Sequence, residues 1–288
     1  MPDNARGARV RRQTVWAALL RKEWYEQRWR FFLGTVVVSG LLAGLLRAQI
    51  VSSVEAAVLI YGPVGLILVI FFAAGPVSSE RADRTWEFLV VQPVSRSEVI
   101  LAKWAMGVVQ LIGTMVIATL AGLLAMWSRG IRMMPDVSEF YGHNAPGAFV
   151  TWSTTHPSLS LCTFAIVGTI ALACWFTPLY LLLARARNEF AATLGGVFLT
   201  IAVLLWLMVG ISHARNTGAN WFATLVTASP WVAMTILNPI SPFLLIIAPN
   251  DATWLPTVLV VDVIVWIVFP LWYVVRSSSR LVEKWVGG

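Results

Sequence analysis

Charged residues are scarce in this sequence: they make up 12% of its 288 residues, whereas 58% are hydrophobic. A soluble domain typically has about 25% charged and roughly 45–50% apolar residues. Folding in water cannot hide that much apolar surface, so lipid must be the solvent for much of the chain. Because no polar stretch exceeds about 40 residues, there is no room for a separate soluble domain. The composition therefore predicts an all-α, polytopic membrane protein.

Signatures of catalysis are missing as well. The chain has no Gly-Lys pair, so it lacks the phosphate-binding loop G-x-x-x-x-G-K-[ST] and cannot be an ATPase. It has no H-E-x-x-H, and its three histidines show no metal-ligand spacing. The turn at Ser212 lacks the second glycine of a nucleophile elbow. We therefore expect a non-catalytic chain with no resident metal or cofactor.

Cysteine is also rare, with only Cys162 and Cys174, and both lie in one apolar run. On a helix their separation along the axis is about 18 Å. A disulfide needs Cα atoms within about 7 Å of each other, so these two residues cannot be bridged while that helix is intact. They are expected to act as small apolar side chains.

Six apolar runs are long enough to cross a bilayer, which takes about 20 mainly apolar residues. They are residues 31–51, 56–77, 104–127, 159–183, 190–211 and 254–275. The first is the most marginal, because its uninterrupted part ends at Leu46 and Arg47 must extend to the interface. The runs predict a six-span transmembrane domain at 31–275, preceded by a cytoplasmic N-terminus at 1–30 and followed by a cytoplasmic tail at 276–288.

The distribution of Lys and Arg predicts the orientation. With the N-terminus in the cytoplasm, only Arg47, Arg129, Arg132 and Arg215 lie outside, which leaves 17 of the 21 basic residues inside. Both termini are therefore expected in the cytoplasm. The net charge of +7 arises at the ends of apolar runs, so it favours a membrane and no nucleic acid as partner.

This orientation places two long segments outside, residues 128–158 and 212–253. Four prolines interrupt the apolar stretches of the second one. We interpret it as interfacial or re-entrant helices and not as a seventh span.

The pattern of residues 14–30 predicts an amphipathic helix that lies in the membrane interface. Trp16, Leu20 and Trp24 recur every four residues on one stripe, and the polar face is basic. Two interpretations stay open: a helix that positions cytoplasmic machinery, or a simple membrane anchor.

Polar and small residues inside the runs suggest further sites. Asp262 lies in the sixth run, where a carboxylate is costly and defaults to a functional hypothesis. Gln110 in the third run is its candidate partner on a transport pathway. The alternative is that Asp262 is a protonated or hydrogen-bonded residue that only packs. Gly40 and Gly44 form a G-x-x-x-G that favours close helix packing, either within the chain or with a second subunit.

Residues 79–103 connect the second and third runs on the cytoplasmic side and carry both signs of charge. Residues Glu80 to Val91 predict a short helix along the membrane, and Pro93 ends it. Ser95, with Glu98 three residues later, predicts a capping box for the helix that follows.

This segment resembles the type-2 ABC transporter permease family, whose members typically read E-R-x-x-G-T-L-E-x-L-L-x-x-P-V-S-R-x-E-I-L-x-x-K here. The matching residues are Glu80, Arg81, Thr85, Glu87, Leu89, Pro93, Val94, Ser95, Arg96, Glu98 and Lys103. Arg84 replaces the usual Gly and Trp86 the usual Leu, which puts the local turn in doubt. The order of amphipathic helix, six spans and proline-broken outer segment is similar to the family over the whole chain.

The resemblance implies the membrane-spanning subunit of an ATP-binding cassette exporter in the cell membrane. Such subunits work as dimers, of like or unlike chains, with a separate ATPase. The implied residues of coupling to the ATPase are Glu80, Arg81, Arg84, Thr85, Glu87, Pro93, Ser95 and Arg96. Two alternatives remain: a secondary transporter with Asp262 as its ion or proton site, and a polytopic membrane enzyme.

Overall fold

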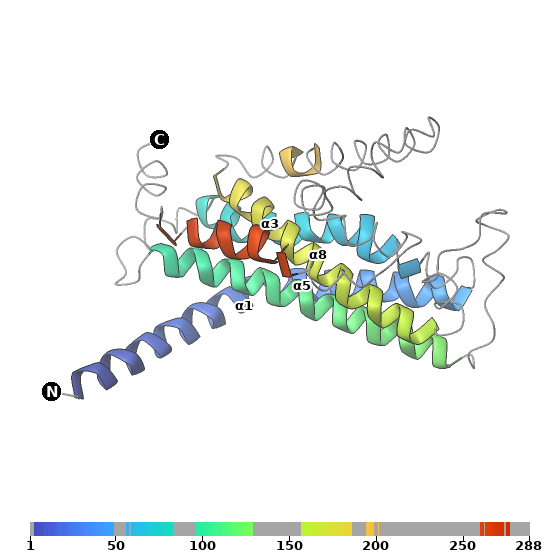
Figure 1. The fold of residues 1–288 in the computed structure, drawn as a ribbon, viewed down its shortest axis with the longest axis horizontal. Coiled ribbons are helices and arrows are strands. Elements are labelled where there is room, and N and C mark those ends of the chain that lie inside the picture. Colours follow the sequence, from blue (N-terminus) through green and yellow to red (C-terminus); the bar gives the residue numbers. More distant parts are fainter. Residues whose placement is uncertain are drawn as a thin grey trace.

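The computed structural model describes residues 3–48, 56–57, 59–82, 96–128, 157–185, 194–198, 201, 260–261, 263–273 and 275–276. Every regular element in this part of the chain is a helix, so the all-α prediction is confirmed there (Figure 1). The elements are α1 (Asp3–Ala48), η1 (Ile60–Val64), α3 (Gly65–Ala82), α5 (Arg96–Trp127), α8 (Pro157–Arg185) and η3 (Ile264–Val268).

Three of these helices are long and apolar enough to cross a membrane. They contain the stretches Trp16–Ala48, Ser97–Trp127 and Ser158–Leu183, which match the first, third and fourth predicted runs. Two shorter apolar helices, Ile60–Ala74 and Ile264–Tyr273, fall in the second and sixth runs. Only six residues of the fifth run are described, so the count of six spans stays a prediction.

Large apolar side chains are exposed on the outward faces of these helices. On α1 they include Trp29, Val36 and Leu41, and on α5 they include Val109 and Leu124. Water would penalise such continuous apolar faces, whereas hydrocarbon accommodates them at no cost. The fold is therefore that of a multi-pass membrane protein.

Helix α1 is continuous over 46 residues, a length of about 69 Å. Neither Pro nor Gly occurs between Ala8 and Leu33, so nothing in the sequence ends the helix before the first span. The predicted N-terminal helix at 14–30 is thus the first part of α1 and is collinear with the span, with its N-terminal end extending beyond the other helices (Figure 1). Its position in the membrane interface stays a prediction.

Helices α1 and α5 lie parallel and keep a constant register. Thr35 Oγ1 lies 3.0 Å from Thr114 Oγ1, and these residues are 79 positions apart in sequence. Farther along, a Cβ added at Gly122 on α5 would lie 3.0 Å from the side chain of Leu42 on α1. The absence of a side chain at Gly122 lets the two helices approach closely.

Helix α8 runs antiparallel to α5 and covers another of its faces. Trp104 Nε1 on α5 donates a hydrogen bond to Thr177 Oγ1 on α8 over 3.2 Å. At the other end of the same pair, a Cβ at Gly122 would lie 3.2 Å from the side chain of Leu161. Gly122 therefore lies where α1, α5 and α8 meet, and the buried core follows these contacts.

The second apolar run begins with a kink. Gly62 has φ −93° and ψ −107°, which are not helical values, and Pro63 follows it inside the π-helical turn η1. Proline has no N–H to donate and disfavours helical geometry in the residue before it, which accounts for the break. Tyr61 in this turn is fully buried and hydrogen-bonded to Thr119 of α5, so the kink is held against the bundle.

Candidate functional site

The two ends of the predicted coupling segment, residues 79–103, lie within the described helices. Glu80 and Arg81 are in the last turn of α3, which ends at Ala82, and Arg96 is the first residue of α5. The residues between these helices fall outside the described part; the predicted coupling residues among them are Arg84, Thr85, Glu87, Pro93 and Ser95. The roles assigned to all eight residues therefore stay predictions.

The described part of α5 begins next to the predicted cap. The helix begins at Arg96, directly after Ser95, and Glu98 lies in its first turn. A carboxylate in the first turn is favoured by the partial positive charge of a helix N-terminus. The capping hydrogen bond of Ser95 itself lies outside the described residues.

The first turns of α5 pack firmly onto α8. Val99 and Ile100 are buried, and the hydroxyl of Tyr180 on α8 donates a hydrogen bond to the carbonyl oxygen of Ile100 over 3.2 Å. The helix that leaves the coupling segment is therefore anchored within two turns of its start.

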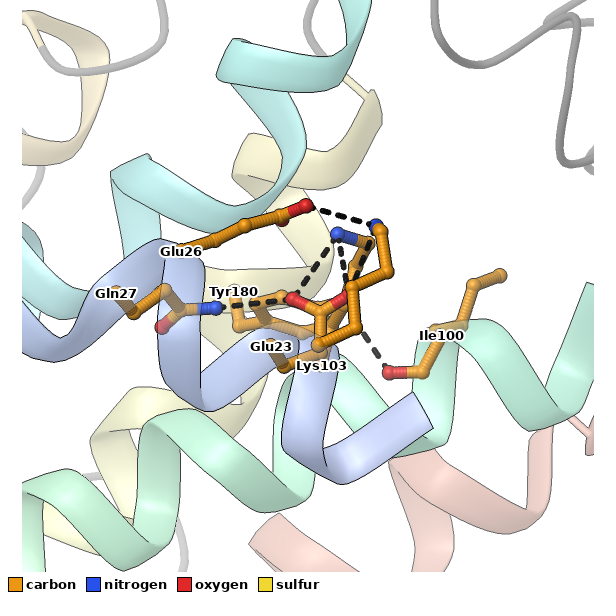
Figure 2. A network of polar contacts seen from close by, with 7 residues as sticks. Glu23, Glu26, Gln27, Ile100, Lys103 and Tyr180 are labelled. Carbon is orange, nitrogen blue, oxygen red and sulfur yellow. Dashed lines mark hydrogen bonds and ion pairs between the residues drawn. The ribbon is translucent and has the colours of Figure 1, made fainter. Parts of the chain in front are cut away.

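Lys103, the last residue of the segment, makes the strongest polar contact of this region. Its Nζ lies 3.0 Å from Oε1 and 3.1 Å from Oε2 of Glu23 on α1. The Lys103 side chain is 2% exposed and that of Glu23 is 1% exposed, so the ion pair is closed off from solvent. Figure 2 shows both side chains meeting between α1 and α5.

Further groups complete the surroundings of the Glu23 carboxylate. Gln27 Nε2, one turn farther along α1, donates a hydrogen bond to Glu23 Oε2 over 3.1 Å. Lys22 Nζ lies 3.6 Å from Glu23 Oε1 and 3.1 Å from Glu26 Oε1, at the exposed side of the cluster. A buried ion pair is stable only when its remaining hydrogen-bonding capacity is also satisfied, and this cluster meets that condition for the carboxylate.

Polar side chains continue along the same stripe of α5. Gln110 and Thr114 follow Lys103 at intervals of seven and four residues, a spacing that puts them on one face of a helix. Gln110 is completely buried, and its amide oxygen and nitrogen have no hydrogen-bond partner among the described residues. Asp262, its predicted partner, lies outside that set, so the pairing stays a prediction.

The G-x-x-x-G of the first span does not pack inside this bundle. Gly40 and Gly44 are exposed, and no described atom lies within 4 Å of a Cβ built at either position. Of the two packing interpretations, contact with another described helix of the same chain is not found.

Other chemistry is sparse in the described part of the chain. It holds no group of three His, Cys, Asp or Glu residues that could bind a metal ion. Neither Cys162 nor Cys174 forms a disulfide, and Cys174 is buried.

Glu23 is the residue that the sequence analysis did not single out. The apolar stripe that predicts the amphipathic helix consists of Trp16, Leu20 and Trp24, which are partly buried. The buried positions are Leu19 and Glu23, followed by Gln27. The sequence gives only a weak signal for the pair, because charged residues of both signs precede the apolar stretches of α1 and α5 and Glu23 and Lys103 are two among several.

Comparison with known families places the whole bundle in context. The family model of the ABC-2 family transporter proteins matches residues 18–272, which include Glu23, the segment 79–103 and all of α3, α5 and α8. A comparison with curated proteins gives no match. Because the family match covers most of the chain and agrees with its apolar helical architecture, the chain belongs to the ABC-2 family of transporter proteins.

Proposed function

We propose that this chain is the permease subunit of an ATP-binding cassette exporter, and that a separate ATPase subunit drives it. The observation that carries the proposal is the ABC-2 family match over residues 18–272 of a chain built from membrane-length apolar helices. This sequence contains no phosphate-binding loop, so the ATPase site is assigned to the proposed partner subunit.

The segment 79–103 is the proposed docking site for that ATPase. It joins the ends of α3 and α5 directly, so a force applied to it reaches two apolar helices through the backbone. Its charged residues, Glu80, Arg84 and Glu87 among them, are suited to specific recognition of a protein partner. The firm packing of Ile100 against Tyr180 supports this assignment, because a coupling element must end on a rigid helix.

The proposed topology has six spans in the cell membrane with both termini in the cytoplasm. Single cysteines at Ser138 and Ser278, introduced after replacement of Cys162 and Cys174, test it. An impermeant thiol reagent applied to intact cells should label position 138 and leave position 278 unlabelled, whereas both should react after permeabilisation. Labelling of position 278 in intact cells would contradict the orientation and the cytoplasmic place of the segment 79–103.

Asp262 and Gln110 are the proposed polar positions of the transport pathway. The buried amide of Gln110 has no hydrogen-bond partner among the described residues, which supports this proposal, since such a group in hydrocarbon is costly unless something pairs with it. Asp262→Asn should reduce ATP-driven turnover and change its dependence on pH, while assembly with the ATPase is kept. Asp251→Asn in the predicted outer segment is the matched control. A pH profile of Asp262→Asn that superimposes on that of the wild type would show that Asp262 only packs.

The proposed assembly contains a second permease subunit, which is either an identical or a related chain. The outward position of Gly40 and Gly44 is compatible with packing against it.

Purification in mild detergent tests the central proposal. The chain should co-purify with an ATP-binding cassette ATPase, and the complex should hydrolyse ATP in proteoliposomes. If the chain purifies without an ATPase and its transport depends only on an ion gradient, the secondary-transporter alternative holds instead.

A further inference from the structure

The coupling segment, residues 79–103, lies near the start of the first span, but the backbone does not join them there. The chain leaves α1 at Ala48 and returns through η1 and α3 before it reaches residue 83. Ala48 lies about 38 Å along the helix from Glu23. A displacement of the segment 79–103 therefore reaches the start of the first span only through contacts between side chains.

The Glu23–Lys103 ion pair is the contact best placed to carry such a displacement. Lys103 lies about 10 Å along α5 from its first residue, Arg96. Its ammonium group bridges both carboxylate oxygens of Glu23, at 3.0 and 3.1 Å. Gln27 on α1 donates a hydrogen bond to one of those oxygens, so contacts within α1 also fix the position of the carboxylate.

The geometry leaves little freedom for the two helices to slide. A shift by one helical turn, about 5.4 Å, would pull these two buried charges apart, and separating a buried ion pair is costly. A second contact, Thr35 to Thr114, lies about 17 Å farther along the same pair of helices. Two contacts at separate levels oppose both sliding and splaying, and only the first is charged.

We propose that Glu23 and Lys103 are positioning residues that join α1 to α5 as one rigid unit, so that movement of the coupling segment is passed to the first span. This rests on the proposed function, because it requires an ATPase that moves the segment. Glu23 and Lys103 contact neither nucleotide nor substrate in this role; they act by fixing the position of α1 relative to α5.

Hydrogen–deuterium exchange of the full complex in nanodiscs tests the proposal. The complex of this chain with its co-purified ATPase is compared without nucleotide and with ATP and vanadate. In the wild type, vanadate trapping should change deuterium uptake both in the first turns of α5 and in residues 16–30 of α1. The response of α5 reports that the ATPase moves the coupling segment, and the response of α1 reports transmission.

Two double variants separate the ion pair from simple packing. The neutral pair, Glu23→Gln with Lys103→Met, keeps similar volumes and leaves no unpaired charge, so it is expected to fold. It should keep the response of α5 and lose the response of α1. The swapped pair, Glu23→Lys with Lys103→Glu, should restore the response of α1.

The neighbouring exposed pair supplies a matched control. Lys22 and Glu26 lie 3.1 Å apart with side chains 40% and 42% exposed. Lys22→Met with Glu26→Gln makes the same chemical changes at an exposed position, and the response of α1 should be kept.

Three results would overturn the proposal: a neutral pair with a full response of α1, a swapped pair without one, or a neutral pair that fails to assemble with the ATPase. The last of these would make the ion pair a determinant of folding alone. Absence of any nucleotide response in wild-type α5 would instead contradict the proposed function.

Discussion

Lys103→Met alone is expected to lower the free energy of unfolding of the helix bundle by about 3–5 kcal/mol, because it leaves the carboxylate of Glu23 buried without its cation. Glu23 is 1% exposed, and the other described cation near it is Lys22, whose Nζ lies 3.6 Å away at the exposed side. The carboxylate can also escape by taking up a proton. For an ordinary glutamic acid at pH 7 that costs about 4 kcal/mol, an amount of the same size.

Unfolding of the purified chain by SDS in mixed micelles measures this loss. Lys22→Met is the matched control, since it removes the same group from a side chain that is 40% exposed and should cost at most about 1 kcal/mol. Adding Glu23→Gln to Lys103→Met should recover most of the stability, because no unpaired charge then remains. Equal stabilities for Lys103→Met and Lys22→Met would show that Glu23 and Lys103 are not closed off from water in the membrane.

Glu87→Lys is expected to weaken binding of the ATPase by roughly a hundredfold or more. The residue belongs to the proposed docking segment, where a reversed charge set against a complementary surface commonly costs several kcal/mol. Each 1.4 kcal/mol corresponds to about a tenfold change in the dissociation constant. Titration of the purified permease with its ATPase measures the constant directly, and the amount of permease in the membrane should not change.

Glu283→Lys in the C-terminal tail is the control for that variant. It makes the same change of charge on the proposed cytoplasmic side of the membrane, but outside the docking segment. It should therefore leave ATPase binding unaltered. If Glu87→Lys binds the ATPase as tightly as the wild type does, Glu87 does not take part in docking, and the coupling role proposed for residues 79–103 is wrong at this position.

The positions of the helices were largely predictable from the sequence. The apolar runs at 31–51, 104–127 and 159–183 correspond to α1, α5 and α8, because a run of that length is stable in lipid only as a helix. The cap at Ser95 and the helix stop at Pro93 stay predictions, because both residues lie outside the described part, which resumes at Arg96.

The continuity of α1 was less evident from the pattern. Residues 14–30 are amphipathic and charged, which favours a separate helix at the membrane surface, yet helix propensity alone does not say whether two adjoining helices are collinear. The structure makes them one helix, and the buried stripe passes through Leu19, Glu23 and Gln27. The aromatic stripe through Trp16 and Trp24 is only partly buried.

The sequence by itself determined that this chain crosses a membrane as helices and lacks the phosphate-binding loop G-x-x-x-x-G-K-[ST], and it carried the pattern of a coupling segment. Those properties depend on local composition and on the spacing of residues along the chain, and they do not depend on which helices contact each other. Only the tertiary structure decided that Glu23 meets Lys103 and that Gly40 and Gly44 face outward. Such contacts depend on the rotation and register of helices whose residues lie some 80 positions apart, and no local pattern encodes that geometry.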